Sequence, residues 1–244
     1  MKKNLLLLTL FLLVLYSCKK ETKPETGNKN NTLPVKNVKT DSVNHFSEQQ
    51  PASFNSGKKP SDLVPAGYEI QYDAKGDLNL DGQTDIALII RKKDDTLAAR
   101  KMLILLKNKD QTYCLYKTSD SVLSDEYNEA GYKMHDPEDI SIKEGDLHID
   151  LYDAGPYGNQ FSQFRYMDGE LILIYLETYN MGAGSHSALF YQPLKGKVTH
   201  ELINTMEEEM PSKSETIFIK KEKYVFETAS PDVIVRKIYD KVDG

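Results

Sequence analysis

Residues 164–171 read Phe-Arg-Tyr-Met-Asp-Gly-Glu-Leu, and this stretch decides the fold class. Strand-forming residues stand on both sides of the pair Asp168-Gly169, and such a pair readily adopts the two positive φ angles of a type I′ turn. A turn of this type joins neighbouring antiparallel strands because its twist matches theirs. The stretch therefore predicts a β-hairpin.

Similar runs recur on both sides of this hairpin, separated by clusters of Gly, Asp and Asn. Short runs rich in Ile, Val, Tyr, Leu and Phe are typical of β-strands. They span residues 68–72, 85–91, 101–107, 112–117, 147–152, 161–167, 170–178, 187–192 and 197–201. In residues 147–151 apolar and polar side chains alternate, as expected for a sheet with one face in water. The short connections at 108–111, 182–185 and 194–196 imply antiparallel neighbours.

We therefore predict a mainly β fold, an antiparallel meander sheet or sandwich with few short helices. One helix is predicted from Ser230 to Lys241, because Ser230-Pro231-Asp232 supplies a cap with proline in the first turn. Residues 119–139 are polar and irregular, and they predict a long loop. Cys114 stands in an apolar run and is expected to be a small core residue.

The amino-terminal residues predict where the protein is located in the cell, and they are not expected to be part of the folded domain. An apolar run from Leu5 to Tyr16 follows two lysines; it is too short to span a bilayer but suits the centre of a secretory signal peptide. It ends in Leu15-Tyr16-Ser17-Cys18, which resembles the lipobox of bacterial lipoproteins. The resemblance implies that residues 1–17 are cleaved and that Cys18 carries the lipid. The alternative is an ordinary secretory signal with a cysteine nearby by chance.

The mature chain divides into a tether and one domain. Residues 18–60 hold very few large apolar groups, so they predict a lipidated cysteine followed by a disordered linker. Residues 61–244 are enough for one β-rich domain with a core. Ten of the 31 basic residues lie outside this domain, namely Lys2, Lys3 and eight linker lysines, so the domain has 21. Four of the 37 acidic residues lie in the linker, so the domain has 33. A net charge of −12 disfavours nucleic acid as a partner and favours cations or a basic partner.

One loop of this domain carries an oxygen-rich pattern. Between residues 77 and 85, oxygen-bearing side chains stand at positions 1, 3, 5 and 9, with Gly82 at position 6. Calcium takes six to eight oxygen ligands, and alternate side chains of a tightly wound loop converge on one point. The predicted ligands are the side chains of Asp77, Asn79, Asp81 and Asp85 and the backbone carbonyl of Gln83, with water completing the shell. The alternative is a polar turn that binds nothing.

The loop is similar to the calcium loop of the FG-GAP and VCBS families, in which Asp-x-Asn-x-Asp-Gly-x-x-Asp leads into an apolar strand. Here residues 86–90, Ile-Ala-Leu-Ile-Ile, take the place of that strand. The loop departs from an EF-hand, because position 12 is Leu88 and not glutamate. More of the chain resembles uncharacterised envelope proteins that carry one such loop after a Val-Pro-x-Gly-Tyr lead-in, here residues 64–68. That resemblance implies a structural calcium ion but no activity.

Catalytic motifs with a recognisable spacing do not appear in the sequence. Ser185 and His186 are adjacent in a strand-like segment and would point to opposite faces, so they are not expected to form a catalytic pair. The histidines at 135, 148, 186 and 200 are expected at the surface. Tyrosines in the candidate meander could hold sugars or peptides, but tyrosine is also a routine strand residue.

We expect an envelope-anchored lipoprotein whose calcium-stabilised β domain is a binding or structural module for a protein or glycan, rather than an enzyme. The acyl chains would anchor it in a membrane. Lys19 gives no acidic retention signal for the inner membrane, which favours the periplasmic or the surface face of the outer membrane. Two alternatives stay open: a hydrolase that uses carboxylates such as Asp150 and Asp153 beside residues 155–158, and an inhibitor of a basic partner.

Overall fold

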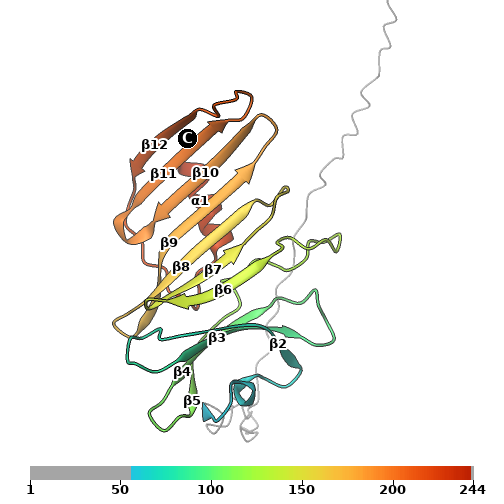
Figure 1. Ribbon diagram of the computed structural model, residues 1–244, viewed down its shortest axis with the longest axis vertical. Helices are drawn as coiled ribbons and strands as arrows, with labels where there is room; N and C mark the ends of the chain where they lie inside the picture. Colours follow the sequence, from blue (N-terminus) through green and yellow to red (C-terminus); the bar gives the residue numbers. More distant parts are fainter. Residues whose placement is uncertain (1–55, 243–244) are drawn as a thin grey trace, which may run out of the picture. The chain divides into compact units, whose positions relative to one another are not determined.

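A computed structural model of the chain describes residues 56–242. The predicted signal peptide (1–17), Cys18 and linker residues 19–55 lie outside the described residues. Two antiparallel sheets and one α-helix make up the described part (Figure 1). The predicted mainly β fold with few helices is confirmed. None of the helices within residues 56–242 has the length and apolar character needed to cross a membrane.

The first sheet has five strands in the order β1-β5-β4-β3-β2. The strands are β1 (Ser56–Gly57), β2 (Tyr68–Gly76), β3 (Asp85–Lys92), β4 (Lys101–Lys107) and β5 (Tyr113–Ser119). A short 3-10 helix, η1 (Pro60–Leu63), connects β1 to β2. β1 pairs with β5 through Ser56 opposite Cys114, so this short strand belongs to the sheet although its residues fall in the stretch assigned to the linker.

The second sheet is a seven-stranded meander in which every strand pairs with the next one along the chain. Its strands are β6 (Glu138–Lys143), β7 (Asp146–Leu151), β8 (Asn159–Met167), β9 (Glu170–Met181), β10 (Ser185–Gln192), β11 (Lys197–Asn204) and β12 (Ser212–Phe218), with η2 (Pro193–Lys195) before β11. Met167 pairs with Glu170 across the turn between β8 and β9. Asp168 and Gly169 have φ angles of 51° and 80°, which confirms the two-residue turn.

The sequence predicted the helix but not two of the strands, β6 and β12. Helix α1 spans Pro231–Val242, close to the predicted residues 230–241. β6 and β12 were not predicted. β6 begins at the end of the segment interpreted as a loop, and β12 is the exposed edge strand of its sheet, with little of the apolar alternation that marks a half-buried strand.

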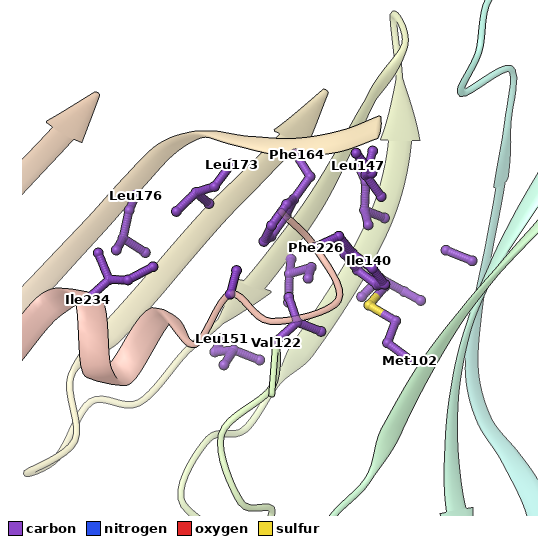
Figure 2. Packing of buried hydrophobic residues seen from close by; sticks show 14 of the residues in the cluster. Met102, Val122, Ile140, Leu147, Leu151, Phe164, Leu173, Leu176, Phe226 and Ile234 are labelled. Carbon is purple, nitrogen blue, oxygen red and sulfur yellow. The ribbon is translucent and has the colours of Figure 1, made fainter. Parts of the chain in front are cut away.

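A single apolar cluster fills the space between the two sheets and under α1. Figure 2 shows Met102 of β4 pointing toward Ile140 of β6, and Phe226 of the segment before α1 lying against Phe164 of β8. The two phenyl rings meet edge to face with centroids 5.5 Å apart, a favoured aromatic geometry. α1 adds Ile234 and Ile238, which are buried in the same cluster. Both sheets and the helix therefore share one core.

The first sheet is buried on both faces. Ala87 and Ile89 of β3 belong to the cluster that faces the second sheet, whereas Ile86, Leu88 and Ile90 belong to a smaller cluster on the opposite face with Leu63 of η1. This explains why residues 86–90 form an apolar run without alternation, as in other strands covered on both sides.

A buried ion pair joins the residue before β4 to the first residue of β6. Arg100 donates from Nη1 and Nη2 to the two carboxylate oxygens of Glu138, at 2.5 and 2.9 Å, and both side chains are 1% exposed. Nη2 also donates to the backbone carbonyl of Ser124, at 3.1 Å. The pair therefore connects the first sheet, the second sheet and the long loop between them.

We predict that Glu138→Leu destabilises the domain by about 3–5 kcal/mol, because it leaves the guanidinium of Arg100 buried without its counter-charge. The double variant Arg100→Met with Glu138→Leu should recover a large part of this loss, because neither buried charge remains. Urea unfolding of the three proteins measures both effects. A single variant as stable as the parent would contradict the inference that this contact holds the sheets together.

Candidate functional site

The predicted calcium loop connects β2 to β3, and packing fixes its start. Gly76 ends β2 in close contact with β6 of the second sheet, because a Cβ atom there would lie 2.6 Å from the backbone oxygen of Ile142. Leu78 is fully buried in the shared core. The loop therefore leaves the first sheet at its contact with β6.

The backbone of the loop turns through the left-handed region twice. Leu80 has φ 59° and Gly82 has φ 84°. The turn at Gly82 was expected, because glycine adopts positive φ without a steric cost. Leu80 was not expected there; its side chain is 70% exposed and lies over the β6–β7 turn, where a Cβ on Gly145 would be 3.1 Å from Leu80 Cγ.

Three of the predicted ligands converge. Asp77 accepts hydrogen bonds from the backbone N–H of Asp81 at 3.0 Å and from that of Gly82 at 2.8 Å. Asn79 Oδ1 accepts from the same N–H of Asp81 at 3.2 Å, and Asn79 Nδ2 donates to Asp81 Oδ2 at 3.1 Å. The side chains of Asp77, Asn79 and Asp81 thus gather around one turn of backbone.

Gln83, whose carbonyl was the fifth predicted ligand, directly follows this turn. Its backbone N–H donates to Asp81 Oδ1 at 2.8 Å. Each carboxylate oxygen has two lone pairs, so the hydrogen bonds within the loop leave acceptor capacity on Asp77 and Asp81.

Asp85 has a different environment from the other predicted ligands. It is fully buried, and Oδ2 accepts from the backbone N–H groups of Leu78 at 2.9 Å and Asn79 at 3.4 Å. Oδ1 accepts from the backbone N–H of Lys107, at the end of β4, at 2.9 Å. The carboxylate therefore ties the loop to the neighbouring strand, a role that the sequence pattern did not indicate. Its additional role as a calcium ligand stays a prediction.

Electrostatics distinguish Asp85 further. Burial raises the pKa of its carboxyl above the ordinary value, and the nearby charge of Asp81 adds to this rise. The three backbone N–H donors act in the opposite direction because they stabilise the ionised form.

The loop fits calcium in the chemistry of its oxygen donors. Asp77, Asn79 and Asp81 would hold the ion together with the Gln83 carbonyl, and the ion would neutralise the mutual repulsion of the carboxylates. Within residues 56–242, no three His, Cys, Asp or Glu side chains lie together as a group that could hold a metal ion. A calcium ion here would thus depend on amide, carbonyl and water oxygens as well as on carboxylates.

The other candidate side chains have structural partners. Asp153 Oδ2 accepts from the backbone N–H of Tyr157 at 2.9 Å and so holds residues 153–157 in a turn. His186 Nδ1 lies 2.7 Å from the hydroxyl of Tyr179 on the neighbouring strand. Cys114 is half-buried, and its Sγ donates to the carbonyl of Leu106.

One histidine contradicts the expectation that all four lie at the surface. His135 is buried, and its Nδ1 has no hydrogen-bond partner within the described residues. Sequence reasoning missed it because residues 119–139 show no apolar periodicity that would indicate burial.

In comparisons with protein-family models, with curated proteins and with solved structures, nothing matches this chain. The similarity to FG-GAP and VCBS calcium loops therefore rests on the residues of the loop alone.

We predict that Asp85→Asn destabilises the domain by about 2–3 kcal/mol even in EDTA, because an amide cannot accept from all three buried N–H groups. The matched variant Asp81→Asn, at an exposed position, should change stability in EDTA by less than about 1 kcal/mol. Urea unfolding in EDTA compares the two. Equal losses would contradict the separation of Asp85 from the exposed part of the loop.

Proposed function

We propose that this chain is a lipoprotein of the bacterial cell envelope, anchored in the outer membrane through Cys18. Its β domain acts as a binding or structural module that calcium stabilises at the loop of residues 77–85. The observation that carries the calcium part of the proposal is the gathering of Asp77, Asn79 and Asp81 around one turn of the loop.

The position of the loop supports a stabilising role for calcium. The loop lies at the contact between the two sheets, with Gly76 against β6 and Leu80 over the β6–β7 turn. An ion that binds only the folded loop stabilises the folded domain as a whole, because unfolding destroys the site. Extracellular modules typically bind calcium with dissociation constants of roughly 10⁻⁴–10⁻³ M. An envelope protein is exposed to calcium at concentrations in this range.

The lipid anchor is supported by the order of segments. An apolar run of signal-peptide length ends at Cys18, and a polar stretch separates this cysteine from β1 at Ser56. Two or more acyl chains on one residue hold a protein firmly, whereas one chain is marginal. In the proposed arrangement the polar stretch is the spacer between membrane and domain.

We predict that calcium raises the melting temperature of the mature protein and that EDTA reverses the rise. At tenfold excess over its dissociation constant, the ion contributes about 1.4 kcal/mol, or about 4 °C for a domain of this size. Asp81→Ala should abolish the difference, and Asp94→Ala, at an exposed position outside the loop, should keep it. Coincident melting curves of the parent protein in calcium and in EDTA would refute the assignment.

We predict that Cys18→Ala leaves the protein with no acyl group when it is made in a bacterial host. Cys114→Ala, the matched control, should stay in the detergent phase on phase partitioning, because Cys114 lies within the folded sheet. Mass spectrometry of the amino-terminal peptide measures the acyl chains directly. Unmodified Cys18 in the parent protein would overturn the proposed lipid anchor and the membrane location that depends on it.

A further inference from the structure

A cleft of about 390 Å³, lined by both polar and apolar groups, lies between α1, the strands β8 and β9, and the loop that precedes β6. α1 crosses one face of the second sheet (Figure 1). Its Asp232, Arg236 and Tyr239 repeat at helical spacing and line one side of the cleft. The volume is in the range of sites that bind small molecules.

The wall opposite the helix is both polar and buried. Ser124, His135, Gln160 and Thr178 line the cleft, and they are four of the eleven buried polar or charged side chains within residues 56–242. Val122 and Leu176, two residues before Ser124 and Thr178, belong to the apolar core. Burying polar groups costs free energy unless they are hydrogen-bonded. Ser124, Gln160 and Thr178 have such bonds, and His135 has an unpartnered ring nitrogen.

Of the buried polar side chains that line the cleft, His135 alone has a polar atom without a hydrogen-bond partner within the described residues. The residue is 5% exposed, and the unpartnered atom, Nδ1, is enclosed. The ring lies beside that of Tyr157, with centroids 6.3 Å apart. Desolvation lowers the pKa of His135, so the imidazole is neutral at pH 7 and offers one donor and one acceptor.

The groups around His135 are held in place by hydrogen bonds to one another. Asp232 Oδ1 accepts from Ser124 Oγ at 3.1 Å and from Gln160 Nε2 at 3.0 Å, so both bonds fall on one oxygen of the carboxylate. The hydroxyl of Tyr239 lies 3.1 Å from Thr178 Oγ1 and accepts from Asn180 Nδ2 at 3.1 Å. Polar groups fixed in this way bind a ligand without first losing side-chain freedom.

The charges around the cleft restrict the ligand. Asp232 and Asp240 against Arg236 give the lining a net negative charge, which disfavours an anion. The remaining polar groups are neutral amides, hydroxyls and an imidazole, which both donate and accept. A cation binds to hydrogen-bond acceptors only, whereas a sugar hydroxyl both donates and accepts. The mixture of donors and acceptors in the cleft therefore fits a sugar better than a cation. The rings of Tyr157 and Tyr239 add apolar surface for the face of a sugar ring.

From this chemistry we propose that the cleft binds a neutral saccharide unit, with Asp232, Gln160 and the hydroxyl of Tyr239 contacting its hydroxyls. The proposal rests on the proposed function in one respect, that the domain is a binding module, and it names the class of ligand. It requires neither calcium at the loop nor lipid on Cys18.

The test is saturation-transfer NMR and calorimetry on the mature protein. The probes are neutral mono- and disaccharides of glucose, galactose, mannose and N-acetylglucosamine, with spermidine as the cationic probe and glucose 6-phosphate as the anionic one. At least one neutral sugar should bind, and Asp232→Asn and Tyr239→Phe should each weaken it by about tenfold, the effect of losing one strong hydrogen bond. Asp94→Asn and Tyr132→Phe, at exposed positions that are not part of the cleft lining, are the matched controls and should bind as the parent does.

Three results would overturn the proposal: no neutral sugar binds, only spermidine or glucose 6-phosphate binds, or a sugar binds with an affinity that neither cleft variant changes. Melting curves of each variant establish that it is folded before binding is compared. The calcium dependence of melting is measured on the same samples, so failure of the saccharide proposal and failure of the calcium assignment are separate outcomes.

Discussion

The packing of β6 against the first sheet is the contact on which the arrangement of the domain depends. Ile140 and Ile142 enter the core that Ala87, Ile89 and Met102 supply from the other side. At the start of β6, Glu138 binds the buried guanidinium of Arg100. Further along, the strand approaches β2 so closely that only glycine fits at position 76. The start of the loop 77–85, the long loop 120–137 and the cleft behind it are all positioned by this contact.

Polar contacts hold the long loop where apolar ones are few. Gln71 Nε2 donates to the buried Glu126 at 2.7 Å, which ties the loop to β2, and Ser124 Oγ donates to Asp232, which ties it to α1. Val122 is the fully buried apolar residue among these contacts. Buried polar networks of this kind favour one arrangement over alternatives, because each misplaced group loses its partner at a cost of about 1–3 kcal/mol.

The sequence predicted features that depend on local order and missed those that depend on distant partners. Asp168-Gly169 encodes its own turn, and the helix after Ser230 is set by its first three residues, so both were predicted within a residue or two. Asp85 was grouped with Asp77 and Asp81 by spacing alone, but the N–H of Lys107 that binds it is 22 residues away. His135 was placed at the surface because the groups around it come from Gln160, Thr178 and α1, which no local pattern connects to it. Composition and periodicity do not indicate contacts between residues that lie far apart in the sequence.

β12 forms one end of the seven-stranded sheet and pairs only with β11 within residues 56–242. A strand in this position offers a row of free backbone donors and acceptors to any extended chain that comes near. Lys213 and Glu215 stand on it at exposed positions, and a second strand laid alongside would have to strip water from both charges. Copies anchored in one membrane, as we propose, would meet edge to edge far more often than copies in dilute solution. The polar composition of β12 is the reason why sequence-based prediction missed this strand. The same polar residues also oppose edge-to-edge association of the sheet with that of a second molecule.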